Sequence, residues 1–398
     1  MKIISIETHL IHTEIPSDKQ VTSGAGTKFA RQAALVEVHT DEGISGVGPC
    51  SFGSASLDLQ AVKSLVDNVF APEIVGREAG QIERIWEHLY HGVILRVLGN
   101  RGMGLAILSG LDIALWDLKG KALGAPIHDL LGGAVVDRIH TYASSVYWGT
   151  PAAAAAEARS YVDQGYQGVK LKIGTTFEND LASAAAIREE VGPGIDLMID
   201  ANMSYSANLA LRMGRELQDL DVLFFEEPLP IDDLEGHRRL TQCLDLRIAT
   251  GENMYTRWAF RDFVDAGAID ILQPDPSRTG GISEVIKIAE LAAVHHLLLA
   301  PHTFSDAFSL AASVHLCAAR STAFILEVDQ TYNPLMAELV DRPMTVSNGA
   351  MPLPTRPGLG IELDRDFVAD HPYNGERGIG AGFQPKVGLA HERAGVRS

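Results

Sequence analysis

The sequence has few cysteines and no excess of positive charge, and each shortage excludes a class of protein. Cys50, Cys243 and Cys317 are the only cysteines among 398 residues. This odd number at wide spacing fits neither a disulfide framework nor a zinc-binding pattern, so we expect reduced thiols and a cytoplasmic protein. With 33 basic against 51 acidic side chains and a net charge of −18, the chain does not suit nucleic acid, which requires clustered lysine and arginine.

Long apolar runs are also missing. No stretch reaches the roughly 18 apolar residues of a membrane span, and the opening MKIISIETHLIHTEI is unlike a signal peptide. We therefore expect no membrane association. Hydrophobic residues nevertheless make up 46% of the chain and charged residues 21%, which is typical of globular proteins. The length predicts two domains, or one large α/β barrel with an appended domain.

Residues 1–126 have the pattern of an α+β domain. Residues 2–10, 32–39 and 44–48 alternate or run apolar like strands, and they predict a three-stranded meander. Helical periodicity then takes over. The three expected helices span 58–71, 81–98 and 103–124, and Gly124-Ala125-Pro126 is a stop signal for the last.

From residue 127 to about 335, short apolar runs alternate with helical stretches. The eight runs are 139–145, 168–174, 196–202, 222–228, 247–253, 269–275, 297–302 and 323–329. This alternation favours a parallel sheet with right-handed crossovers, and eight units can close into a barrel. An open doubly wound sheet is the competitor, but no GxGxxG follows a first strand.

The third segment, 336–398, ends the alternation. Residues 343–364 predict short strands and turns that pack back on the N-terminal domain. Beyond about residue 380 the chain is rich in glycine, proline and charge, which predicts a disordered tail.

Polar side chains end the apolar runs of the predicted barrel, where barrel enzymes place their active sites. They are Lys170, Lys172, Asp200, Glu226, Glu252, Asp275, His302 and Glu327. From Lys172 onward the successive spacings are 28, 26, 26, 23, 27 and 25 residues, as one βα unit per step produces. A single acid after a strand is more often a helix N-cap. Seven consecutive units ending in this way favour a common site instead.

Three neighbouring strands of this set end in carboxylates: Asp200, Glu226 and Glu252. Three crowded carboxylates cannot all stay ionised without a counter-charge, so we expect a divalent cation. Oxygen ligands without cysteine or a histidine pair favour magnesium over zinc, with one Mg²⁺ per subunit. Asn202 and Asn253 follow two of these ligands and are candidates to support them. Glu227 is most simply an acid at the start of the next helix, ahead of Pro228.

Two further pairs could supply bases. Lys170 and Lys172 share one face of a strand, and near a metal each ammonium should lower the pKa of the other, leaving one neutral as a base. An ordinary anion-binding pair is the alternative. Asp275 can fix the tautomer of His302 and make the imidazole a stronger base. The two bases would then flank a metal-bound substrate from opposite faces.

This layout suits the removal of the proton next to a carboxylate. Such protons are too weakly acidic for a base at neutral pH unless positive charge stabilises the developing enediolate. Magnesium and Lys170 would supply that charge, and a protonated Glu327 would hydrogen-bond the same carboxylate from the other side. The expected partner is therefore a small-molecule carboxylate.

The ordered motifs KLK, IDAN, FFEEP, TGEN, QPD and PH resemble those of the enolase superfamily, mandelate racemase subgroup. The resemblance covers most of the chain. It implies a modified TIM barrel of the (β/α)7β type, with an α+β N-terminal capping domain completed by C-terminal residues. It also implies the roles of eight residues: Asp200, Glu226 and Glu252 bind magnesium, Lys172 and the His302–Asp275 dyad are the bases, and Lys170 and Glu327 stabilise the enediolate.

The resemblance does not fix the reaction, because the subgroup includes a racemase, sugar-acid dehydratases and a lactone cycloisomerase. Our leading hypothesis is a magnesium-dependent acid-sugar dehydratase that gives a 2-keto-3-deoxy acid, since His302 can protonate a leaving β-hydroxyl. A racemase or epimerase of a 2-hydroxy acid and a sugar-acid lactone cycloisomerase are the alternatives. The resemblance also implies a homo-oligomer, an octamer or a dimer.

Two other classes are disfavoured by particular residues. A scaffold that keeps the fold without turnover should have broken ligands, and here all three carboxylates and both base pairs are intact. A metal-dependent barrel hydrolase usually has an HxH pair on its first strand, and IHTYA offers one histidine.

Substrate choice is expected to depend on two loops of the capping domain, roughly 15–31 and 48–57, that close over the mouth. Their polar side chains, which suit hydroxyl-rich or doubly acidic substrates, are Thr22, Ser23, Lys28 and Ser51. Tyr147 and Trp148, after the first barrel strand, are candidates for lining the pocket. Packing in the core or at an interface is the alternative use of these aromatics.

Overall fold

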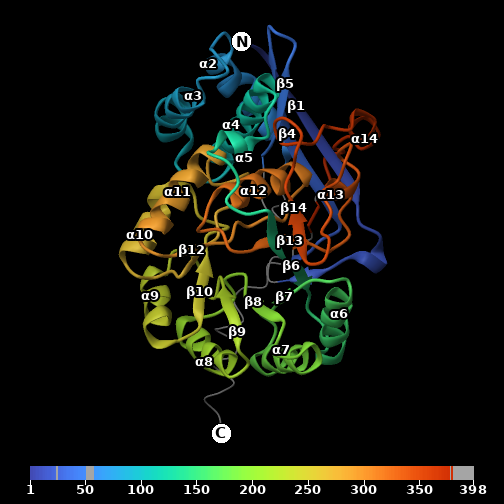
Figure 1. The fold of residues 1–398 in the computed structure, drawn as a ribbon, viewed down its shortest axis with the longest axis vertical. Helices are drawn as coiled ribbons and strands as arrows, with labels where there is room; N and C mark the ends of the chain where they lie inside the picture. Colours follow the sequence, from blue (N-terminus) through green and yellow to red (C-terminus); the bar gives the residue numbers. More distant parts are fainter. Residues whose placement is uncertain (24–25, 51–57, 377, 380–398) are drawn as a thin grey trace.

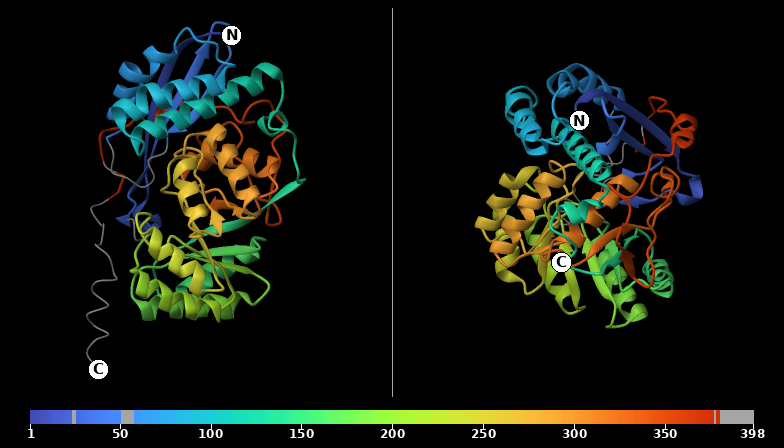
Figure 2. Two further views of the ribbon diagram at one scale, coloured as in Figure 1. Left: turned by 90° about the vertical axis from the view of Figure 1, so that its left-hand side faces the viewer. Right: turned by 45° about the horizontal axis from the view of Figure 1, so that its top comes forward.

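The computed structural model describes residues 1–23, 26–50, 58–376 and 378–379. The predicted loop residue Ser51 and the tail beyond residue 380 lie outside these ranges. An N-terminal α+β part, blue to cyan, lies beside a barrel coloured green to orange (Figures 1 and 2).

The N-terminal sheet is antiparallel, in the order β1–β4–β5. Its strands are β1 (Ile3–Glu14), β4 (Ala30–Thr40) and β5 (Ser45–Cys50). One face packs on the long helix α4 (Met103–Leu123). The approach is close enough to require glycine, because a Cβ at Gly48 would lie 1.9 Å from the carbonyl oxygen of Gly110. The predicted meander and its covering helix are therefore both present.

Short helical elements lie between residue 58 and α4. They are α1 (Leu59–Leu65), the π-helical η2 (Val66–Phe70), α2 (Ala71–Ile74), α3 (Ile82–Leu89) and the π-helical η3 (Tyr90–Leu98). A further short helix, α5 (Ile127–Leu130), lies between α4 and the barrel. A 3₁₀ turn, η1 (Ser17–Lys19), and a small hairpin, β2 (Thr22–Ser23) with β3 (Gly26–Thr27), interrupt the chain between β1 and β4. No described helix, α4 included, is long and apolar enough to cross a membrane.

The barrel contains all the predicted strands, each parallel to its neighbours. They are β6 (Arg138–Val146), β7 (Gly168–Lys172), β8 (Asp196–Asp200), β9 (Val222–Glu226), β10 (Arg247–Thr250), β11 (Ile271–Leu272), β12 (Leu298–Leu299) and β13 (Leu326–Asp329). The strands run from β12 through β6 to β13, and a parallel bridge between Leu299 and Ala323 closes the circle. The fold predicted from the sequence is confirmed.

Helices link successive strands and surround the barrel (Figure 1). They are α6 (Pro151–Asp163), α7 (Phe177–Val191), α8 (Ala207–Gln218), α9 (Leu234–Cys243), α10 (Thr256–Asp265), α11 (Ile282–Val294) and α12 (Ala307–Ala319). Inside, the buried side chains of Tyr142, Met198 and Phe224 form part of a plug. Because alternate strand residues share a face, Asp200 and Glu226, two residues beyond Met198 and Phe224, point inward above that plug.

The C-terminal segment differs from the prediction in one respect. β14 (Ala350–Pro352) pairs antiparallel with β6 of the barrel rather than with the N-terminal sheet. The reason is that β6 pairs with β13 only from Thr141 onward. The backbone groups of residues 138–140, at the start of β6, are therefore available to pair with β14. Farther on, α14 (Arg365–Asp370) returns to the N-terminal part, where Phe367 packs in the cluster of Ile11. The remaining helix, α13 (Pro334–Ala337), follows β13.

Candidate active site

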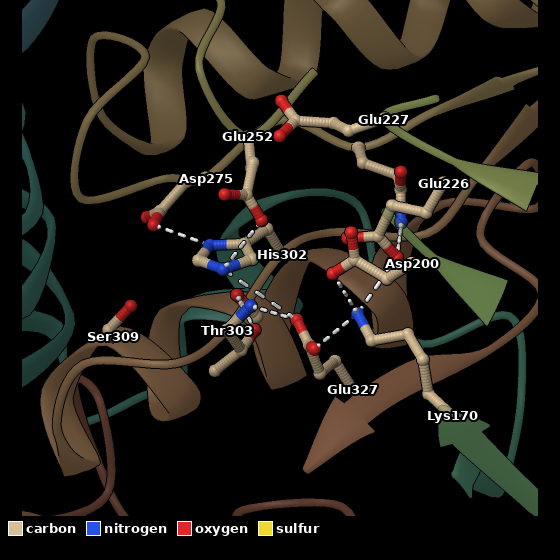
Figure 3. A network of polar contacts seen from close by, with 12 residues as sticks. Lys170, Asp200, Glu226, Glu227, Glu252, Asp275, His302, Thr303, Ser309 and Glu327 are labelled. Carbon is tan, nitrogen blue, oxygen red and sulfur yellow. Dashed lines mark hydrogen bonds and ion pairs between the residues drawn. The ribbon is translucent and has the colours of Figure 1, made fainter. Parts of the chain in front are cut away.

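The strand-end side chains identified in the sequence lie together at the mouth of the barrel. Figure 3 labels all of them except Lys172, which contacts Asp200. Lys170 and Lys172 come from β7, Asp200 from β8, Glu226 from β9 and Glu327 from β13, and the others directly follow β10, β11 and β12. Seven of the eight are buried, and Glu252 is half-buried. Each is held on a rigid barrel strand or just beyond it, so the group is preorganised.

Three carboxylates form the centre of this group. Asp200, Glu226 and Glu252 offer oxygens that lie within 4.8 Å of one another. Oε1 of Glu226 is buried and has no hydrogen-bond partner among the described residues, which is unfavourable for a carboxylate oxygen. Burial and the nearby Asp200 raise the pKa of Glu226 to about 7. An oxygen-only donor set with an unpaired oxygen and excess negative charge fits a hard divalent cation such as Mg²⁺.

Both lysines contact these acids. Lys170 Nζ lies 2.8 Å from Glu226 Oε2 and 2.7 Å from Glu327 Oε1, and Lys172 Nζ donates to Asp200 Oδ2. Burial opposes the charged forms, but the carboxylates raise the pKa of Lys170 well above its ordinary value and raise the pKa of Lys172 as well. Lys170 lowers the pKa of Lys172, as predicted, but Asp200 raises it by more; that one of the two lysines is neutral beside Mg²⁺ stays a prediction. The attraction of the nearby carboxylates exceeds the repulsion between the two lysines.

A histidine and an aspartate face the lysines from the other side. His302 Nδ1 lies 2.9 Å from Asp275 Oδ2, while Oδ1 accepts from Ser277 N at 2.8 Å and from Ser277 Oγ at 2.5 Å. Burial alone would raise the pKa of Asp275, but the contact with His302 lowers it, so the carboxylate is ionised. An ionised carboxylate only accepts, which places the proton on Nδ1 and turns Nε2 toward the acids. Although burial lowers the pKa of His302, Glu252 and Glu327 help raise it to about 9.

Glu327 lies between Lys170 and His302 (Figure 3). Its Oε2 accepts from the backbone N–H of Thr303 at 3.0 Å and lies 4.0 Å from His302 Nε2. Burial alone would raise the pKa of Glu327, but Lys170 and His302 bring it well below its usual range. The direct contact with Lys170 therefore favours the ionised form of Glu327, and a protonated Glu327 that hydrogen-bonds a substrate carboxylate stays a prediction.

Two asparagines hold the carboxylates in place. Asn202 donates from its backbone N to Asp200 Oδ1 at 2.7 Å and from Nδ2 to Oδ2 at 3.2 Å. Asn253 Nδ2 lies 3.2 Å from Glu252 Oε1. Such contacts to ligand carboxylates fix the direction of their lone pairs.

Glu227 does not start a helix, contrary to the simplest interpretation of its position. Helix α9 begins at Leu234 and is capped by Asp233, whereas Glu227 is buried, has a φ of 37° and accepts from Asn253 Nδ2 at 2.9 and 3.0 Å. The turn after β9 directs this side chain toward Asn253, where it becomes part of the support of Glu252.

Sequence reasoning missed two other supporting residues. Arg278 Nη1 donates to the backbone oxygen of Glu252 at 2.7 Å and to Asn253 Oδ1 at 2.9 Å. Gln273 Nε2 donates to Glu226 Oε2 at 2.9 Å. Gln273 precedes Asp275 by two residues, so strand periodicity could have revealed it. Arg278 reaches Glu252 from a loop of another βα unit, and no local pattern indicates that contact.

The predicted specificity residues have different surroundings. Lys28 Nζ lies 4.1 Å from the centre of the Phe304 ring, and Lys172 Nζ lies 5.8 Å from the same ring. Thr22 pairs with Thr27 through their hydroxyls at 2.9 Å in the β2–β3 hairpin, which also contains the buried Ser23. Lys28 therefore adjoins the barrel mouth, and Phe304 is a mouth residue that the sequence did not reveal.

The aromatic pair after β6 packs on the barrel. Trp148 Nε1 donates to the backbone oxygen of Ile173 at 3.1 Å, and Tyr147 is buried. The contact of Trp148 with the end of β7 matches the packing alternative for this residue.

Two family descriptions match the chain. Residues 5–132 match the mandelate racemase / muconate lactonizing enzyme N-terminal domain, and residues 153–367 match the enolase C-terminal domain-like family. The chain belongs to the enolase superfamily. Within this superfamily it falls in the mandelate racemase and muconate lactonizing enzyme group, whose members bind Mg²⁺ at an acidic site.

Relatives within the superfamily carry out more than one reaction. The chain is 35% identical to a D-galactarolactone cycloisomerase of Agrobacterium fabrum, over 93% of this chain and 98% of that protein. It is also 35% identical to an arabinonate dehydratase of Saccharolobus solfataricus, over 85% of this chain and 89% of that protein. A crystal structure from Bordetella bronchiseptica RB50, provisionally described as a mandelate racemase, is 45% identical with a TM-score of 0.94, covering 98% of this chain and 99% of that one.

Proposed function

We propose that this protein is a magnesium-dependent sugar-acid dehydratase, which removes the proton next to a carboxylate and then eliminates water to give a 2-keto-3-deoxy acid. The observation that carries the proposal is the placement of the carboxylate cluster between Lys172 on β7 and His302 after β12. Superfamily membership and the arabinonate and galactonate dehydratases among the relatives support it. A homo-oligomer in the cytoplasm completes the proposal, in line with the family resemblance and the reduced cysteines.

Asp200, Glu226 and Glu252 would hold the Mg²⁺, because their oxygens converge and one of them is unpaired. When bound, the ion supplies the positive charge that stabilises an enediolate. Lys170 is protonated and buried, so it adds a fixed positive charge on the same side. Tyr142, whose hydroxyl lies 3.4 Å from Lys170 Nζ, limits the positions that this ammonium can adopt.

The proton moves through named atoms of the two bases. Although burial opposes the charged forms, Asp200 and Glu252 raise the pKa of Lys172 and His302, respectively. With Mg²⁺ bound, the charge of these carboxylates would be offset, which allows one of the two groups to lose its proton. The uncharged Lys172 Nζ or His302 Nε2 then takes the α-proton, and the electrons of the C–H bond form the carbon–carbon double bond of the enediolate. Asp275 keeps its hydrogen bond to Nδ1, so the second proton of the imidazolium is the one on Nε2. His302 then gives a proton to the β-hydroxyl, the β carbon–oxygen bond breaks, and water leaves. The resulting enol rearranges to the 2-keto-3-deoxy acid.

A lactone cycloisomerase is the second candidate, and one observation favours it. The D-galactarolactone cycloisomerase of Agrobacterium fabrum matches 93% of this chain at 35% identity. Its reaction can share the first step, because loss of the α-proton also permits a β-carboxylate to leave from a lactone ring. The two candidates then differ only in the leaving group.

Proton exchange in deuterated water tests the proposal. The protein is incubated with Mg²⁺ and a panel of aldonates, aldarates and their lactones, and the products are followed by NMR. We expect α-proton exchange and a keto acid with at least one member. Exchange without elimination would favour a racemase, ring opening of a lactone alone would favour the cycloisomerase, and no exchange with any acid would refute the enediolate mechanism.

A pair of variants tests whether His302 acts as a base. His302→Asn should lower turnover by about 10²- to 10⁴-fold, the usual contribution of a general acid or base. His91→Asn is the matched control, because His91 is exposed and lies outside the site, where it contacts Glu87 and the ring of Tyr90. Circular dichroism should show the same fold in both variants. Retained activity in His302→Asn would refute its assigned role.

A further inference from the structure

Lys28 is a buried cation at the barrel mouth that the proposed mechanism does not use. Its side chain is 7% exposed, and its Nζ lies 4.1 Å from the centre of the Phe304 ring. The Arg31 guanidinium lies 5.1 Å from the ring centre, and both candidate bases are also near it: Lys172 Nζ is 5.8 Å from the ring centre and the His302 ring is 6.5 Å away. The ammonium groups of Lys28 and Lys172 are therefore no more than about 10 Å apart.

Arg31 anchors the segment that carries Lys28. Its Nη2 lies 3.1 Å from Asp329 Oδ2, at the end of β13, and it also donates to the hydroxyl of Thr331. Both side chains of the Arg31–Asp329 pair are buried, and Asn333 adds a hydrogen bond to Asp329 at 3.0 Å. The start of β4 is thus attached to the barrel two residues from Glu327, and the charge of Arg31 is already neutralised.

Lys28 has no such partner among the described residues, since none of their carboxylates forms an ion pair with it within 4.0 Å. Burial, together with the nearby Arg31, lowers the pKa of Lys28 well below its ordinary value. An unpaired buried ammonium is unfavourable, and a bound anion would stabilise it. Phe304 covers it on one side and reduces its contact with water, which strengthens any such pairing.

We propose that Lys28 binds the distal carboxylate of a dicarboxylic substrate, so that the enzyme prefers aldarates or their lactones to aldonates. This inference rests on the proposed function, because the first carboxylate must lie at the acidic cluster for the α-carbon to reach Lys172 or His302. Five carbon–carbon bonds of about 1.5 Å separate the carboxyl carbons of an extended six-carbon diacid by about 6 Å. Because the two ammonium groups are no more than about 10 Å apart, a diacid of this length that has its α-carbon beside Lys172 can reach Lys28 with its distal carboxylate.

The test compares an aldarate with the aldonate of the same configuration, which differ only at the terminal carbon. Lys28→Met removes the charge at similar volume, Lys28→Arg keeps it, and Lys19→Met is the matched control on an exposed lysine of the same loop. We expect Lys28→Met to lower kcat/KM on the aldarate by about 10- to 100-fold, mainly through KM, as loss of a charged hydrogen bond does. On the aldonate the change should be less than about threefold, and Lys28→Arg should restore part of the loss.

Equal losses on both acids, or a wild-type enzyme without preference for the aldarate, would overturn the inference. Exchange of the aldonate α-proton in the same samples would show that the proposed function stands even then. Calorimetric binding of both acids to wild type and to Lys28→Met, with Mg²⁺ present, gives a readout that does not need turnover. A loss of affinity confined to the diacid supports the site, and an unchanged affinity refutes it.

Discussion

Asn253 connects Glu252 to a buried chain of side chains, and its removal should weaken cation binding. Its Nδ2 lies 3.2 Å from Glu252 Oε1 and 2.9 and 3.0 Å from the two oxygens of Glu227. Its Oδ1 accepts from Arg278 Nη1 at 2.9 Å. Asn253→Ala removes all of these contacts, so the Glu252 carboxylate loses the group that fixes its direction.

The size of the loss in Mg²⁺ affinity depends on the contacts that Glu252 keeps in the Asn253→Ala variant. Arg278 still donates to the backbone oxygen of Glu252 at 2.7 Å, so the strand end stays in place, and the carboxylate keeps a contact from Oε2 to His302 Nε2 at 3.1 Å. Residues that orient metal ligands typically contribute about 10- to 100-fold to metal affinity, equivalent to about 1.4–2.7 kcal/mol. We expect Asn253→Ala to fall in this range rather than to abolish binding.

Isothermal titration of Mg²⁺ into the cation-free protein measures this change directly. Asn208→Ala is a suitable control, because Asn208 accepts a hydrogen bond from Arg239 on the exposed surface. The control should bind Mg²⁺ like the wild type. A dissociation constant for Asn253→Ala within twofold of the wild-type value would refute the supporting role, as would an equal loss in the control.

Two further predictions concern stability. Burial lowers the pKa of His315 to about 3, against about 6.5 in an unfolded chain. The unfolded state therefore takes up a proton first as the pH falls from 6.5 to 3, which costs about 2 kcal/mol of stability at pH 5. Urea unfolding at pH 7 and 5 should show a smaller loss for His315→Gln than for the wild type, and equal losses would contradict this. Separately, Mg²⁺ at 100 times its dissociation constant should raise the unfolding free energy by about 2.7 kcal/mol; a melting-temperature shift of the same size in Glu226→Gln would count against Glu226 as a ligand.

The sequence by itself determined the architecture and the type of chemistry. The eight apolar runs were enough to predict the barrel, because a βα unit has a characteristic length and each strand shows its own hydrophobic pattern. The residues that end those runs were predictable for the same reason. Asp200, Glu226 and Glu252 each close one strand, and the carboxyl ends of parallel strands meet at one rim of a barrel.

Only the tertiary structure decided the charge states and the partners of these groups. The sequence placed Lys170 beside Lys172, but it did not show that Lys170 contacts Glu226 and Glu327 or that Lys172 contacts Asp200. Although burial opposes the charged forms, these carboxylates raise the pKa of both lysines. Likewise, nothing in the neighbouring sequence shows that Lys28 and Arg31 have different surroundings. In the structure Asp329 neutralises the charge of Arg31, whereas Lys28 faces the barrel mouth. A pattern in the sequence reports the spacing of residues along the chain, whereas electrostatic interactions depend on distances in space between residues that are far apart in the chain.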